Sequence, residues 1–140
     1  MFAKDGIFNR TAITVTRNAL DTYALRSKTM ANNIANMTTP GYRRIDVAFE
    51  EKLREALDPD KISGSRTDEN HFYTGKLPAQ MVKAEGYRAL DATKPGEINN
   101  VDVDMEMARL AENSINFNFG VRFIQDRMRD IEGAIKTQAQ

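Results

Sequence analysis

The sequence predicts a mainly α-helical fold. In this fold we expect long N- and C-terminal helices that pack as a coiled coil, a short middle helix, and a central segment that is irregular or forms a small β-hairpin. Two apolar stripes with helical spacing, one toward each end of the chain, predict the long helices. Prolines and glycines crowd the stretch between them. We expect one elongated domain over residues 1–140, with an N-terminal helical region over 1–57, the irregular segment over 58–98 and a C-terminal helix over 99–140.

The N-terminal helix is predicted by side chains that recur every three or four residues. Its stripe is narrower and less apolar than the C-terminal one, and several alanines beside it permit close approach of another helix. We expect the helix to stop near three asparagines, Asn32, Asn33 and Asn36, because asparagine leaves helical geometry at little cost. The stripe consists of Ile13, Thr16, Leu20, Tyr23, Ser27, Met30 and Ile34.

Pro40 and Gly41 predict a type II turn, since proline fixes the first central φ and glycine accepts the positive second one. After the turn, residues 46–57 are predicted as a short amphipathic helix with apolar residues spaced by four. In the segment that follows, only residues 71–73 and 86–90 suit strands. We expect these to form a small hairpin, or the segment to become ordered only in an assembly. The apolar face of the middle helix is Phe49, Leu53 and Leu57.

The most regular apolar pattern lies in the last forty residues and has the spacing of a heptad seam. A helix from Val103 to Lys136 would be on the order of 50 Å long at about 1.5 Å per residue, which the rest of the chain is too short to cover. A second strip of Ile115, Phe119 and Phe123 would pack within the chain or against a neighbour. We therefore expect part of this helix to contact another helix. The seam is Val103, Met107, Leu110, Phe117, Val121, Ile124, Met128, Ile131 and Ile135.

Acidic and amide side chains mark the start of the C-terminal helix. Asn100 or Asp102 can accept hydrogen bonds from the first free backbone amides, and the carboxylates favour the positive end of the helix dipole. Asp102, Asp104 and Glu106 could alternatively hold a metal ion, but the glycine and distant glutamate of a calcium loop are missing. Capping accounts for all of them, so no metal site or cofactor is predicted.

Composition excludes several classes of protein. Twenty basic residues balance twenty acidic ones and the isoelectric point is near 6.6, which argues against nucleic-acid binding. No apolar run approaches the roughly 20 residues of a membrane-spanning helix, and residues 1–6 do not open a secretory leader. The chain has no cysteine. We therefore expect no membrane insertion, and any export by another route.

Charged residues are unevenly distributed along the chain, and few side chains are candidates for catalysis or ligand binding. Residues 1–57 carry a net charge of +3 and residues 97–140 one of −3, which suits antiparallel terminal helices, head-to-tail copies or chance. His71 has no nucleophile beside it, so an enzyme is not expected. Arg43 and Arg44 could bind a phosphate or an acidic partner, or simply be solvated.

Two segments resemble the signatures of the bacterial flagellar rod, hook and hook-associated proteins. One covers residues 31–42 and the other residues 99–107, and they stand in the expected order. Together with the length, they make the chain similar to the proximal rod proteins, the FlgB family. The ending at residues 113–117 departs from that of the longer relatives, which weakens assignment to the sister FlgC type. The assembly residues implied by the resemblance are Asn33, Asn36, Thr39, Pro40, Gly41, Tyr42, Asn100, Val101, Asp102 and Glu106.

The resemblance implies a structural subunit of the flagellar basal-body rod. Such subunits assemble helically, transmit torque from the motor, and have terminal helices that are poorly ordered before assembly. The implied location is the periplasmic rod, reached by the flagellar type III export apparatus without a cleaved signal peptide. Implied partners are other copies, other rod proteins, the rod-to-ring adaptor and the membrane ring. The alternative is a cytosolic coiled-coil adaptor that dimerises through the same seam and does not polymerise.

Overall fold

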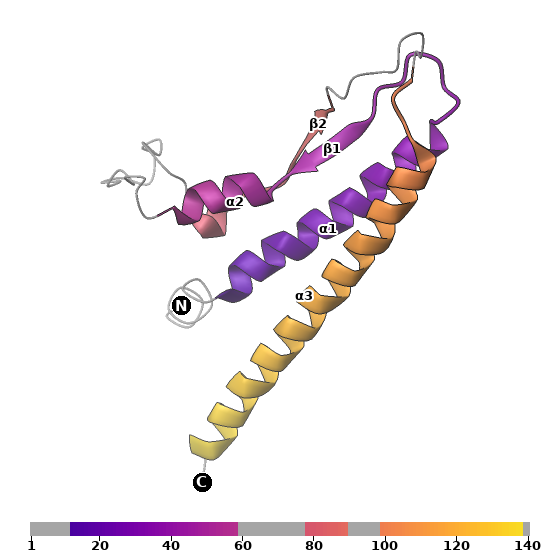
Figure 1. The fold of residues 1–140 in the computed structure, drawn as a ribbon. Helices are drawn as coiled ribbons and strands as arrows, with labels where there is room; N and C mark the ends of the chain where they lie inside the picture. The colour runs from indigo at the N-terminus through magenta and orange to yellow at the C-terminus, as the bar shows by residue number, and fades with distance from the viewer. Residues whose placement is uncertain (1–11, 59–77, 90–98, 139–140) are drawn as a thin grey trace.

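The computed structural model describes residues 12–58, 78–89 and 99–138 (Figure 1). Two long helices dominate it, and a short helix and a small antiparallel sheet lie beside the first of them. This confirms the predicted fold class. The elements are α1 (Ala12–Ala35), β1 (Ile45–Ala48), α2 (Glu50–Leu57), the 3₁₀ turn η2 (Ala79–Met81), β2 (Glu85–Arg88) and α3 (Val103–Gln138).

The two long helices pack against each other in antiparallel directions. Asn33 near the end of α1 contacts Glu106 near the start of α3, and Leu20 lies against Gly120 one hundred residues away in the sequence. In this register the part of α3 beyond about residue 127 extends past Ala12, the first described residue of α1 (Figure 1). In the described part of the chain, no helix has the length and apolarity needed to cross a bilayer.

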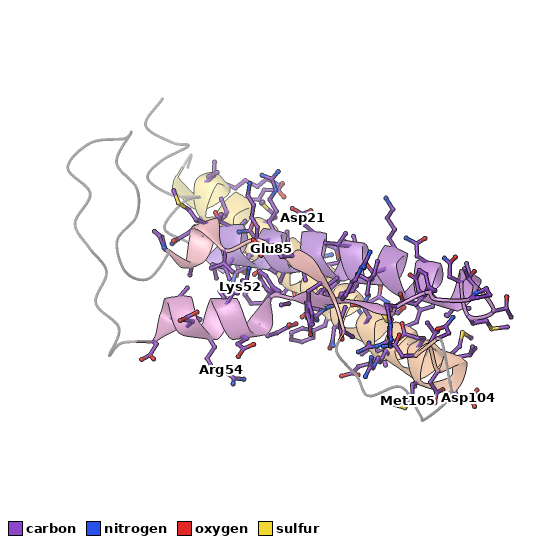
Figure 2. The ribbon with its side chains drawn as sticks, turned by 90° about the horizontal axis from the view of Figure 1, so that it is seen from above. Asp21, Lys52, Arg54, Glu85, Asp104 and Met105 are labelled. Carbon is purple, nitrogen blue, oxygen red and sulfur yellow. The ribbon has the colours of Figure 1, made fainter. Side chains whose placement is uncertain are left out.

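A small apolar core joins α1, α2 and η2. Phe49 and Val82 are almost fully buried, together with Ala56. The sheet lies next to this core, with Ile45 of β1 opposite Arg88 and Ala48 opposite Glu85 of β2. Figure 2 shows Lys52 of α2 close to Glu85, with which it forms an ion pair of 2.5 Å. Half-buried residues that pack against the core are Ala19, Leu53, Ala79 and Ala84.

The prediction of a helix over residues 46–57 was wrong in its first part. Residues 45–48 form β1, and the helix begins only at Glu50. The backbone of 45–48 is extended because it has hydrogen-bond partners on both sides. One partner is β2, and the other is the Asn33 side chain of α1, which binds Ile45. The apolar face also differs, since Ala56 is buried whereas Leu57 is 61% exposed. The strand partner of residues 85–88 is therefore β1, and residues 71–73 lie outside the described residues.

The turn after α1 agrees with the prediction. Gly41 has a φ of +76°, and the Tyr42 N–H donates to the Thr39 carbonyl oxygen at 3.3 Å across Pro40 and Gly41. These features are typical of a type II turn. The helix itself continues to Ala35, so Asn33 lies inside α1 and does not stop it.

Candidate functional site

Both signature segments meet where α1 ends and α3 begins, at one end of the molecule (Figure 1). Residues from the end of α1, the turn, the start of β1 and the start of α3 hydrogen bond to one another there. We call this cluster the junction. Its members are Asn33, Tyr42, Arg44, Asn99, Asn100 and Glu106.

Asn33 is the centre of the junction and has no exposed surface. Its Nδ2 donates to the Ile45 carbonyl oxygen at 2.8 Å and to Glu106 Oε2 at 3.0 Å. Its Oδ1 accepts from the Ile45 N–H at 3.0 Å and from the Tyr42 hydroxyl at 2.9 Å. Both donors and both acceptor sites of the amide are used, so no other side chain of similar size replaces it. Asparagine at this position fixes α1, β1 and α3 relative to one another.

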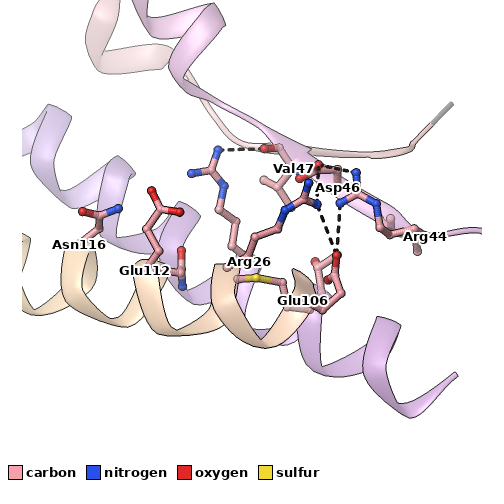
Figure 3. A pocket seen from close by; sticks show the side chains of 12 residues that line it. Arg26, Arg44, Asp46, Val47, Glu106, Glu112 and Asn116 are labelled. Carbon is pink, nitrogen blue, oxygen red and sulfur yellow. Dashed lines mark hydrogen bonds and ion pairs between the residues drawn. The ribbon is translucent and has the colours of Figure 1, made fainter. Parts of the chain in front are cut away.

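Glu106 and Arg44 form a buried ion pair next to Asn33. Their side chains are 1% and 8% exposed, and Arg44 Nη1 lies 3.3 Å from Glu106 Oε1. Arg44 also pairs with Asp46 at 3.1 Å, as Figure 3 shows from close by, and Arg109 lies 3.4 Å from Glu106. The prediction that capping accounts for Glu106 was wrong, because its carboxylate points into the junction. Arg44 is likewise neither solvated nor free to bind a phosphate.

Two neighbouring asparagines just before α3 bind the backbone that follows α1. Asn99 Nδ2 lies within hydrogen-bonding distance of the Asn36, Met37 and Thr39 carbonyl oxygens, between 2.9 and 3.1 Å, where α1 ends. Asn100 Oδ1 accepts from the Arg44 N–H at 2.7 Å. Asn99 thus ties the backbone just after α1 to the segment before α3, and Asn100 ties the residue before β1 to the same segment.

Asp102 caps α3, which decides between the two predicted caps. Its Oδ1 accepts the Met105 N–H at 3.1 Å, and its carbonyl oxygen accepts the Glu106 N–H. Asn100 instead accepts from the Arg44 N–H just before β1, and Val101 donates its N–H to Asn99 Oδ1. Within the described ranges, no group of three acidic, histidine or cysteine side chains could hold a metal ion.

Burial raises the pKa of Tyr42. Removal of the phenol from water raises its pKa above the ordinary value of 10.0, and the negative charge of Glu106 raises it further. The hydroxyl therefore stays protonated and donates to Asn33 Oδ1. The remaining members of the first signature, Thr39, Pro40 and Gly41, are exposed on the turn, and Asn36 is half-buried and binds the Asn32 carbonyl oxygen and the Thr39 hydroxyl.

The face of α3 that α1 covers differs from the predicted apolar seam. Its centre is Glu106, Asn113 and Gly120, which are spaced by seven residues and are the buried side chains or positions among residues 103–136 of α3. Asn113 Nδ2 donates to the Tyr23 carbonyl oxygen and to the Ser27 hydroxyl, both at 2.8 Å. The seam lies along one edge of this contact. The half-buried seam residues of α3 are Val103, Leu110, Val121, Ile124 and Ile131, and the exposed ones are Met107, Phe117, Met128 and Ile135. In the stripe of α1, the buried residue is Met30, and the half-buried residues include Ile13, Leu20, Tyr23 and Ile34.

A cavity of about 160 Å³ opens between α1, β1 and α3 (Figure 3). Its walls alternate basic and acidic side chains, and the three arginines are each paired with a carboxylate. Asn113 Oδ1 is buried against it and has no hydrogen-bond partner among the described residues. Charged residues of the wall are Arg26, Arg44, Asp46, Glu106, Arg109 and Glu112.

Comparison with known proteins supports the resemblance read from the two signatures. Residues 13–43 match the family described as flagella basal body rod protein. The flagellar basal body rod protein FlgB of Bacillus subtilis strain 168 is 31% identical over 121 residues, covering 86% of each chain. The chain belongs to the FlgB family. The FlgB proteins of Aeromonas hydrophila and Escherichia coli K12 are 28% and 25% identical and cover 84% and 90% of this chain, and 87% and 94% of their own.

This family places the chain in the flagellar basal body as a structural subunit of the rod, where it assembles with other rod components. The family match covers α1, the turn and the approach to β1, and so includes Asn33, Tyr42 and the exposed turn. Sequence reasoning missed Arg44, Asn99, Asn113 and Gly120 as structural residues. The spacing by seven of Glu106, Asn113 and Gly120, parallel to the apolar seam, was the available signal.

Proposed function

We propose that this rod subunit transmits motor torque in the periplasm. It reaches the rod through the flagellar export apparatus and keeps its N-terminus uncleaved. Its partners are other copies of itself, further rod proteins, the rod-to-ring adaptor and the membrane ring. The residues of the two signatures, from Asn33 to Tyr42 and from Asn100 to Glu106, serve assembly by giving the subunit a fixed shape at the junction.

The junction carries this proposal. A torque-bearing subunit must keep its helices in one relative orientation, and nonpolar packing alone permits sliding. Buried polar groups resist sliding, because any shift leaves a donor or acceptor unpaired at a cost of about 1–3 kcal/mol each. The Asn33, Arg44 and Glu106 contacts join α1, β1 and α3 in this way. The exposed turn at Pro40 and Gly41 stays available for neighbours.

Incorporation is tested with a charge on the α3 face that packs toward α1. Ile124→Asp places a carboxylate at a half-buried position, at a cost of several kcal/mol. We expect this variant to be exported normally, to be absent from purified basal bodies and to leave cells non-motile. The control is Gln125→Asp, one residue away and exposed. Normal swimming of the Ile124→Asp strain would count against a rod subunit that depends on this helix.

Export is tested separately by mass spectrometry of the protein recovered from basal bodies. We expect an N-terminal peptide that begins within Met1–Ala3, and no recovery outside the cytoplasm from a strain without the flagellar export apparatus. A shortened N-terminus, or export in the mutant strain, would overturn this part of the proposal.

A further inference from the structure

The outer face of α3 carries an uncovered apolar strip. Ile115 and Phe119 are 69% and 72% exposed, which makes them the most exposed large hydrophobic side chains of the described residues. At about 100° per residue they lie on the side of the helix opposite Asn113 and Gly120, which face α1. In Figure 1, α3 forms one edge of the molecule, so this face has no neighbour within the described chain. Ala108 and Ala111 extend the strip toward the start of the helix.

A second exposed stripe, on α1, has the complementary shape. Ala24, Ala31 and Ala35 are spaced by seven and four residues, which brings them to one side of α1, with Lys28 among them. All four are exposed. Small side chains let a neighbouring helix approach closely, so large residues such as Phe119 fit against them.

Charges beside the two stripes fix how they would align. In an antiparallel pairing with Phe119 on Ala24, Arg122 lies opposite Asp21 and Asp126 lies opposite Arg17. Three of these side chains are exposed and form no ion pair with any described residue: Arg17, Asp21 and Arg122. Figure 2 shows Asp21 on the side of α1 turned away from α2. Asp126 pairs at 3.4 Å with Arg129 of its own helix turn.

Other alignments lack this complementarity. A shift of one heptad in one direction places Arg122 against Lys28, and a shift in the other places Phe119 against Arg17. The first shift brings like charges into contact, which opposes binding. The second moves Arg122 away from Asp21 and opposite Thr14. A parallel pairing with Phe119 on Ala24 brings Arg122 to Ser27 and Asp126 to Ala31, so both charges lose a partner.

We propose that the α3 strip of one subunit binds the α1 stripe of a second copy of this chain, with Phe119 on Ala24 and Arg122 paired with Asp21. This rests on the proposed function and names one of its subunit contacts. Because α1 and α3 are antiparallel within a subunit, copies that point the same way bring α3 and the neighbouring α1 together in the antiparallel sense. The two surfaces differ, so the contact is heterologous and continues along an open array.

Disulfide trapping tests the contact directly, because the natural chain has no cysteine. Full-length Ala24→Cys protein is mixed with Phe119→Cys protein at high concentration and oxidised, and the same pair is co-expressed for isolation of basal bodies. We expect a dimer joined through positions 24 and 119. Arg54→Cys, at an exposed site on α2, is the control that replaces Ala24→Cys and should give no product with Phe119→Cys.

The outcomes separate this proposal from the proposed function. Basal bodies that contain both variants without the 24–119 bond overturn the contact and leave the rod function standing. A 24–119 bond in purified protein, with no chain in basal bodies, supports the contact and overturns the rod function. A bond between position 119 and a different rod protein overturns the choice of a second copy, as does a product joined only through two copies of position 24.

Charge reversal tests the register. Asp21→Arg and Arg122→Asp each replace an opposite pair by a like pair, so we expect about a 3- to 10-fold loss of the 24–119 product, in line with about 1 kcal/mol for an exposed pair. The double variant Asp21→Arg with Arg122→Asp restores the pair with the signs exchanged and should recover the product. Arg54→Asp is the control for net charge. Losses in the double variant equal to those of both single variants combined would overturn the pairing of Asp21 with Arg122.

Discussion

The side-chain amide of Asn33 forms two hydrogen bonds with the backbone of Ile45, as a neighbouring strand would do: its Oδ1 accepts from the Ile45 N–H and its Nδ2 donates to the Ile45 carbonyl oxygen. The helix α1 thus supplies a substitute strand partner to the first residue of β1. On the other side of β1, the partner is β2, with Ile45 opposite Arg88. One helical side chain therefore decides where the extended segment begins.

Asn33→Ala should be among the most destabilising single changes in this chain. It leaves the Ile45 backbone, the Tyr42 hydroxyl and one Glu106 oxygen without their partner, at a cost of about 2–4 kcal/mol. The measurement is urea denaturation followed by far-UV circular dichroism. Asn32→Ala, at the exposed neighbouring position, is the control and should change stability by less than about 0.5 kcal/mol. Equal midpoints for the two variants would contradict the role of Asn33.

Arg44 and Glu106 should behave as a coupled pair. Removing one partner, as in Arg44→Met or Glu106→Leu, leaves a buried charge and should cost about 3–5 kcal/mol. We expect the double variant to be less destabilised than the two single losses combined, because no buried charge remains unpaired there. The same denaturation experiment, arranged as a double-mutant cycle, measures the coupling. Simple additivity would show that Arg109 and Asp46 satisfy these charges by themselves.

Gly120 and Gly133 both lie within α3 but should respond oppositely to substitution. A Cβ at Gly120 would lie 2.9 Å from Leu20 Cδ2, whereas at Gly133 it would meet nothing within 4 Å. Gly133→Ala should stabilise the helix by up to about 1 kcal/mol through helix propensity. Gly120→Val should lower the melting temperature, because a branched side chain pushes α1 away from α3. A higher melting temperature for Gly120→Val would show that the contact between Leu20 and Gly120 does not hold the helices in place.

Tyr42 should give the protein a stability loss at alkaline pH. Burial raises its pKa in the folded state, with a further contribution from the charge of Glu106. The stabilising effect of the neutral phenol is complete below about pH 10, the ordinary tyrosine value, and is lost as the pH rises through the higher folded-state pKa. Unfolding midpoints measured between pH 8 and 11 should fall more steeply for the natural protein than for Tyr42→Phe. Parallel curves would refute the shift.

Much of the helical architecture followed from the sequence. The stripes from Ile13 to Ile34 and from Val103 to Ile135 predicted α1 and α3, because a period near 3.6 residues is a local property of the chain. The turn at Pro40 and Gly41 was also local, since it depends on the φ angles that these two residues allow. The acidic start of α3 indicated a cap, and Asp102 provides it.

The strand β1 could not be predicted in the same way. Residues 45–48 are compatible with the start of a helix, and their extended shape depends on Asn33 and on β2, which are distant in the sequence. Contacts of this kind override local propensity. The burial of Arg44 has the same cause, because its partner Glu106 is 62 residues away.

The sequence by itself determined that this protein has two long helices and a Pro-Gly turn after the first of them, because helix and turn preferences act between near neighbours along the chain. Only the tertiary structure decided which face of α3 meets α1. Polar contacts at Asn33 and Asn113 and the absence of a side chain at Gly120 set the register there, and they turn Phe119 and Ile115 outward. Apolar spacing alone could not reveal this, because an unsatisfied buried polar group costs as much free energy as a buried apolar side chain gains.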